Sequence, residues 1–153
     1  MSSLPNSGRE IAEEWLARAE WRHSTGLRAL DETGDTKEAV RDFASAGELA
    51  LKAVYIKLGT PFPRTHSVWE LMEECPDQSV QDVLEGHSER FVKEFSRNYL
   101  APCVRARPVP AEDIEVCRRF SRRMMRWASG VVGDLTSDPS PTGHLRDSNP
   151  DRM

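Results

Sequence analysis

The chain has 153 residues and a formal net charge of -4 at pH 7, which is the size of one domain and argues against indiscriminate binding to DNA. No run approaches the ~20 apolar residues of a transmembrane helix, and no signal peptide opens the chain, so we expect a cytoplasmic protein without a membrane partner. Three cysteines without CxxC spacing predict neither a zinc site nor a disulfide framework. We expect no metal and no cofactor.

The two ends of the chain differ in composition from its middle. Residues 1–8 and 137–153 are polar and contain proline, glycine and serine, which predicts a flexible N-terminus and a disordered tail. Between them, residues 9–136 carry apolar side chains at steps of three and four, without the alternation of β-strands. We therefore predict one all-α domain.

Two long helices are predicted first, over residues 10–32 and 36–58. His23 lies on the apolar side of the first helix, where we expect a hydrogen-bonded core histidine. The second helix carries a stripe of small residues that lets another helix approach closely, within the chain or across a homodimer interface: Ala44, Gly47, Ala50 and Ala53. Glycine inside a helix costs roughly 1 kcal/mol relative to alanine, so we expect the close approach at Gly47.

A glycine stop and a new helix cap follow. Gly59 supplies the left-handed residue that ends the second helix, and prolines prevent its continuation. Ser67 and Glu70 have the spacing of a capping box, which predicts a third helix over 67–75, before Pro76.

This region resembles the signature of HEPN domains, small helical proteins that include nucleotide-associated members and RNases. The residues that carry the resemblance are AGELALKAVYIKLG (46–59), PFPRTH (61–66) and VWEL (68–71). The resemblance implies an up-and-down bundle of four core helices plus a short extra helix, and a homodimer. Short connections between long helices favour the same bundle.

A fourth helix is predicted over 79–100, with His87 inward. Nucleolytic HEPN members carry Arg, often followed by Asn, and then His after a gap of four to six residues. Arg97 and Asn98 fit that start and are the candidate catalytic residues, but Pro102, Cys103 and Val104 occupy the histidine positions. Because proton transfer near neutral pH usually needs histidine, the resemblance points to a degenerate nuclease motif.

The fifth helix, predicted over 111–134, has an apolar seam and a cationic side formed by Arg118, Arg119, Arg122, Arg123 and Arg126. Like charges four residues apart repel, which a bound phosphate would offset. Arg97, Arg105 and Arg107 lie just upstream. The alternative is a solvated face neutralised by acidic residues such as Glu115.

Together these features predict binding of nucleotide or RNA phosphate without RNase activity. The candidate ligand-binding residues are Arg97, Arg105, Arg107, Arg118, Arg122, Arg126 and His66, although His66 could instead fix the turn before the third helix. The resemblance also implies a minimal nucleotidyltransferase partner in a toxin-antitoxin-type system. Alternatives are a metal-independent endoribonuclease with a non-standard active site and a purely structural interaction module.

Overall fold

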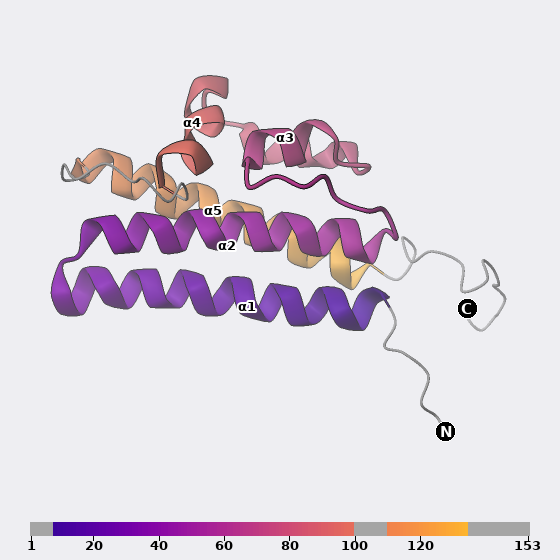
Figure 1. Ribbon diagram of the computed structural model, residues 1–153, viewed down its shortest axis with the longest axis horizontal. Coiled ribbons are helices and arrows are strands. Elements are labelled where there is room, and N and C mark those ends of the chain that lie inside the picture. The colour runs from indigo at the N-terminus through magenta and orange to yellow at the C-terminus, as the bar shows by residue number, and fades with distance from the viewer. Residues whose placement is uncertain (1–7, 100–109, 135–153) are drawn as a thin grey trace, which may run out of the picture.

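The computed structural model describes residues 8–99 and 110–134, except the side chains of residues 94 and 96–99 (Figure 1). It contains the helices α1 (Gly8–Arg28), α2 (Thr36–Lys57), α3 (Val68–Glu73), α4 (Glu89–Tyr99) and α5 (Ala111–Gly133). A π-helical turn, η1 (Ala29–Thr33), extends α1, and a 3-10 helix, η2 (Gln78–Leu84), precedes α4. No strand occurs in the described part of the chain, which confirms the all-α bundle of four long helices and a short one.

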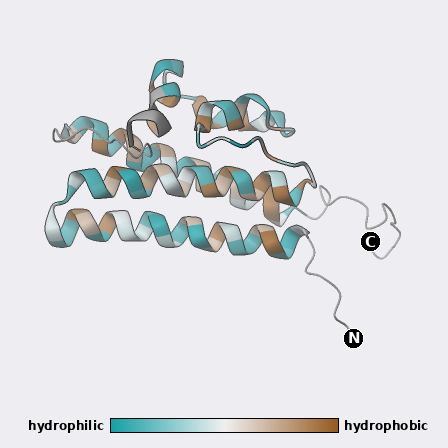
Figure 2. Ribbon diagram, in the orientation of Figure 1, coloured by the Kyte–Doolittle hydropathy of each residue, from teal (hydrophilic) through white to brown (hydrophobic). Residues whose placement is uncertain are grey.

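Helix α2 lies at the centre of the bundle. It runs antiparallel to α1, while α5 packs along both helices of this hairpin and α3 and α4 contact α2 as well (Figure 1). Figure 2 shows hydrophobic and hydrophilic residues interspersed along α1 and α2, as expected for amphipathic helices. Fourteen of the 22 residues of α2 are buried, which only a helix surrounded on several sides can achieve.

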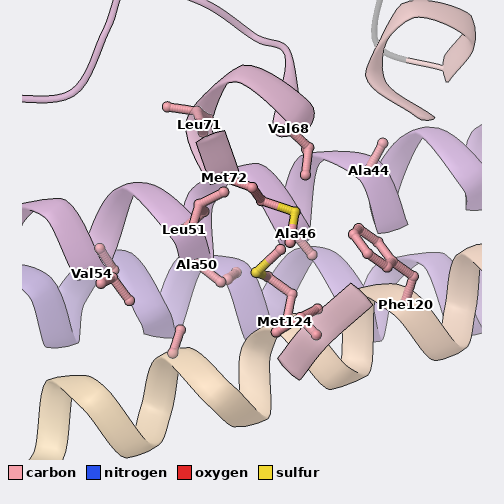
Figure 3. Packing of buried hydrophobic residues seen from close by; sticks show 14 of the residues in the cluster. Ala44, Ala46, Ala50, Leu51, Val54, Val68, Leu71, Met72, Phe120 and Met124 are labelled. Atoms are coloured by element: carbon pink, nitrogen blue, oxygen red, sulfur yellow. The ribbon is translucent and has the colours of Figure 1, made fainter. Parts of the chain in front are cut away.

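The small-residue stripe of α2 is buried inside the chain. Ala44 and Ala50 face a core that Met72 of α3 and Phe120 and Met124 of α5 complete (Figure 3). Small side chains let the large residues of these helices approach the α2 backbone. The structure therefore favours packing within the chain over a homodimer interface for this stripe.

Gly47 does not make the tight contact that the sequence suggested. A Cβ at Gly47 would lie 3.5 Å from Phe95 Cε2, an ordinary contact. At Gly26 of α1 it would lie 2.8 Å from Phe43 Cε1 and 3.1 Å from the Ala39 carbonyl oxygen. The expectation for Gly47 was therefore wrong, and Gly26 is a position where the packing of α1 on α2 needs glycine.

The ends of α2 and α3 follow the predicted capping. The Gly59 and Thr60 N–H groups donate to the carbonyls of Ile56 and Tyr55, and Gly59 has φ 73°. Ser67 Oγ accepts from the Glu70 N–H at 3.2 Å, which confirms the cap. The capping box is only half formed, since the Ser67 N–H donates to Thr65 Oγ1 instead of to Glu70.

The continuous fourth helix predicted over 79–100 is wrong. Asp77 Oδ1 accepts from the Ser79 N–H at 2.9 Å and opens η2, which ends before Gly86. Gly86 has φ 86°, a left-handed conformation that breaks the helix. A new helix, α4, begins after Ser88, whose Oγ accepts from the Phe91 N–H at 3.0 Å.

The predicted terminal segments stay predictions. The flexible segment expected over 1–8 ends at the first residue of α1, and residues 1–7 lie outside the described part of the chain, as do residues 135–153.

Candidate functional site

The cationic side of α5 borders a surface depression of about 510 Å³. Apolar residues on the opposite side of α5, among them Phe120 and Met124, are buried in the core, so the arginines point outward. The turn between η2 and α4 forms the facing wall. The residues that line the depression are Glu85, Gly86, His87, Val116, Arg119, Arg122, Arg123 and Arg126.

Arg123 joins α5 to this turn. Its guanidinium donates to the backbone carbonyls of Glu85 and of Asp82, the latter at 3.1 Å, and its Nη2 pairs with Glu85 Oε1 at 3.1 Å. Three acceptors fix the side chain against the wall of the depression. Arg123 is therefore a structural element of the site as well as a source of positive charge.

Arg118 is neutralised locally, as the solvated-face alternative expected. Its Nε and Nη2 donate to the two carboxylate oxygens of Glu115, and Arg119 Nε lies 3.7 Å from the same carboxylate. The hydrogen bond from Arg118 holds the pKa of Glu115 below its usual value. Arg118 does not line the depression.

Arg122 and Arg126 differ from Arg118, because no hydrogen bond or ion pair to a described residue engages either guanidinium. They stand one helical turn apart and repel each other at this spacing. Both line the depression, together with Arg119 and Arg123. Four guanidinium groups thus share one hollow, and Glu85, the one acidic residue among its described lining residues, is paired with Arg123.

His87 shares this hollow, which no local sequence pattern indicated. Its ring stacks on Phe91 at a centroid distance of 5.6 Å and meets the edge of Phe120 at 5.2 Å, so it is half-buried rather than in the core. Burial lowers the pKa of His87, and Arg123 and Arg119 lower it further. A neutral imidazole therefore faces the arginines at neutral pH.

The other predicted site residues are only partly placed. Arg97 and Asn98 lie in the last turn of α4, and their side chains are outside the described part of the structure. Arg105 and Arg107 fall in residues 100–109, which are also not described. Their part in the site stays a prediction.

His66 lies in a different hollow, lined by Ser45, Glu48, Leu49 and His66 itself. Its Nδ1 is 2.9 Å from Glu48 Oε2, which also accepts from Lys52 Nζ at 2.7 Å. The structure therefore does not join His66 to the lining of the arginine depression. The bond to Glu48 ties the turn before α3 to α2, as the structural alternative expected.

Within residues 8–99 and 110–134, no group of three or more His, Cys, Asp or Glu side chains could hold a metal ion. None of the described helices has both the length and the apolar character to cross a bilayer.

Comparison with known proteins assigns the family. Neither a curated protein nor a solved structure matched the chain. The family model of the HEPN domain matched residues 12–131, which span α1 to α5 and include both the α2–α3 signature and the arginine side of α5. The chain belongs to the HEPN domain family.

Proposed function

We propose that this HEPN domain binds the phosphates of RNA or of nucleotides in the depression beside α5. The observation that supports this most is the gathering of four arginines, of which Arg122 and Arg126 have no acidic partner among the described residues. Guanidinium groups donate paired hydrogen bonds to phosphate oxygens, and a bound phosphate would remove the repulsion along α5.

The proposal includes a homodimer and a minimal nucleotidyltransferase partner, both of which rest on family resemblance. Arg97 and Asn98 stand at the end of α4, where family members with nuclease activity carry their motif. A second copy of this helix end would add positive charge to a shared cleft. Light scattering at several protein concentrations tests the dimer, and co-purification with a nucleotidyltransferase encoded beside it tests the partner.

The phosphate site is tested by titrating a fluorescent single-stranded RNA of about ten nucleotides and following its anisotropy at several salt concentrations. We expect Arg122→Gln with Arg126→Gln to weaken binding about tenfold and to lower the salt slope by one to two, because two phosphate contacts are lost. Arg28→Gln, which removes an exposed arginine from α1, is the matched control. Equal affinities for all three proteins would contradict the proposal and favour a structural module.

A second candidate function is endoribonuclease activity, which the position of His87 favours. Its half-buried ring faces the arginines in the depression and could accept a proton from a ribose 2′-hydroxyl. RNA incubated with the pure protein should then yield fragments ending in a 2′,3′-cyclic phosphate. His87→Asn should abolish cleavage while RNA binding persists. Intact RNA after long incubation would leave the binding function alone.

A further inference from the structure

A second groove of about 500 Å³ lies between α1 and α2, apart from the arginine depression. Its walls are formed by residues about one helical turn apart on the two helices: Ala17, Arg18, Trp21 and Arg22 on α1, and Ser45 and Leu49 on α2. Trp21 is 60 % exposed, and it is the single large hydrophobic side chain left exposed among those that the structure describes. The proposed phosphate site gives this exposed indole no role.

Two arginines flank Trp21 in the groove. Arg18 Cζ lies 5.8 Å from the ring centroid of Trp15, a cation–π contact that positions the guanidinium, and no described carboxylate forms an ion pair with Arg18. Arg22 Nη1 lies 3.2 Å from Oδ1 of the buried residue Asp42, and the Arg22 side chain is still 42 % exposed. Both guanidinium groups therefore have N–H donors left for a partner.

The groove combines this positive charge with apolar surface, which Ala17, Trp21 and Leu49 contribute. Asp42 offsets part of the charge of Arg22, so the groove is less positive than the depression beside α5, where four arginines meet. Trp and Arg are also the residue types most enriched at the hot spots of protein interfaces. A protein segment that carries an apolar anchor and carboxylates fits these features better than a nucleic acid does.

A second copy of this chain fits the groove less well than an acidic partner does. The described lining residues include two cations, Arg18 and Arg22, and no acid. In an isologous contact both copies present the same face, so four arginines would meet. Such a like-charge juxtaposition costs affinity, whereas a partner with carboxylates at this position gains two ion pairs.

The shape of the groove favours a helical segment. Two antiparallel helices with a groove between them can accept the apolar stripe of a third helix, whose anchors are then spaced by three or four residues. Ser45 and Leu49 also line the smaller hollow that contains His66, so the groove continues in that direction. The 83 % exposed side chain of His66 supplies a hydrogen-bond partner for a polar residue at that end.

We propose that the α1/α2 groove is a docking site for an acidic amphipathic helix of another protein. An apolar or aromatic residue of that helix packs on Trp21 and Leu49. Asp or Glu residues one turn away on the same face pair with Arg18 and Arg22. Because the groove is small, we expect the affinity of a transient interface, in the micromolar range.

Selection from a phage-displayed library of random peptides of about four helical turns tests the proposal. Peptides that also bind the Trp21→Ala protein are removed at each round. We expect the remaining peptides to carry Leu or an aromatic residue, with Asp or Glu three or four positions away. A library that yields no peptide dependent on Trp21, or only basic ones, would overturn the docking site.

Fluorescence anisotropy of a labelled selected peptide then measures the contribution of each side chain. Trp21→Ala and Arg18→Glu should each weaken binding at least about tenfold. Lysine in place of the acidic residues of the peptide should restore binding to Arg18→Glu, which loss of a structural role would not allow. Arg28→Gln, on the same helix outside the groove, and the Arg122→Gln, Arg126→Gln variant should bind like the unchanged protein.

The tryptophan indole signals in NMR spectra locate the peptide directly. The titration should shift the signal of Trp21 and leave that of Trp127, whose Nε1 donates to Ser79 Oγ, in place. Loss of peptide binding in the Arg122→Gln, Arg126→Gln variant would place the peptide in the arginine depression and overturn the proposal. Displacement of the peptide by the single-stranded RNA would assign the groove to nucleic acid instead. Loss of a dimer in Trp21→Ala, measured by light scattering, would assign it to a second copy.

Discussion

His23 is a buried titratable group between α1 and α5. Its Nδ1 lies 3.0 Å from Ser121 Oγ, and its ring packs against Phe43 at 5.0 Å. Burial, and then the positive charges of Arg122 and Arg118, lower the pKa of His23 to about 4. The expectation of a hydrogen-bonded core histidine is confirmed.

This histidine makes stability depend on pH. In the unfolded chain His23 binds a proton near pH 6.5, whereas in the folded protein it stays neutral down to about 4. The contribution of His23 to the free energy of unfolding should therefore be fully present above pH 6.5 and should be lost as the pH drops toward 4. Between pH 7.5 and pH 5 we expect a loss of about 1–2 kcal/mol in urea unfolding.

His23→Gln should flatten this pH dependence, even if it lowers stability overall. Ser24→Ala is the control, because Ser24 is an exposed neighbour on α1 without a titratable group and should leave the slope in place. An unchanged slope in His23→Gln would assign the acid sensitivity to other groups.

Lys57 is a buried cation at the other end of the bundle. Its Nζ donates to the carbonyl oxygens of Val131 at 3.1 Å and Asp134 at 2.6 Å, at the C-terminal end of α5, where the helix dipole favours positive charge. Lys57→Met should lower the free energy of unfolding by about 2–4 kcal/mol, since buried carbonyls lose a charged donor. Lys93→Met, at an exposed ion pair with Glu89, should cost less than about 1 kcal/mol.

Local pattern could not foresee the role of Lys57. A lysine off the apolar stripe of a helix is usually solvated, and its burial depends on where another helix ends in space. His87 is a similar case, since its place beside the arginines follows from the turn at Gly86. The cationic side of α5 could be predicted from the sequence, because the spacing of its five arginines places them on one side of a helix.

At the scale of elements, Gly26 and Gly47 provide a matched pair of substitutions. Gly26→Ala would place a Cβ 2.8 Å from Phe43 and should lower the free energy of unfolding by about 1–3 kcal/mol. Gly47→Ala makes an ordinary contact of 3.5 Å and should raise it by up to about 1 kcal/mol through helix propensity. Thermal unfolding followed by circular dichroism measures both.

Equal destabilisation by the two alanines would show that α1 and α2 pack differently from the described geometry. The sequence pointed to Gly47 because its neighbours are alanines, whereas the steric requirement depends on which side chain faces the glycine. Phe43, one turn before Gly47 on α2, packs against Gly26 of the facing helix.

Element boundaries were predictable wherever a residue has one dominant conformational effect. Gly59 ends α2 and Ser67 opens α3, because a left-handed glycine and a serine cap act locally. The break between η2 and α4 was missed, since the apolar spacing continues through Gly86 and suggests one helix. The actual break turns His87 toward α5.

At the scale of the molecule, the periodicity of the apolar residues was sufficient for the fold, because each helix can bury its stripe only against the others. It was insufficient for the candidate site. The arginine depression needs the turn after η2 packed against α5, and these two segments lie far apart in the sequence.

The last prediction concerns which part of the chain carries the stability. A chain of residues 8–136 should keep its melting temperature within about 2 °C of the full chain, because it retains every described core contact. Ending the chain at residue 130 removes buried Val132 and the carbonyls that Lys57 contacts. This truncation should lower the melting temperature by at least about 5 °C. If both truncations melt equally early, residues 1–7 or 137–153 contribute to the core, and the domain boundaries must be moved outward.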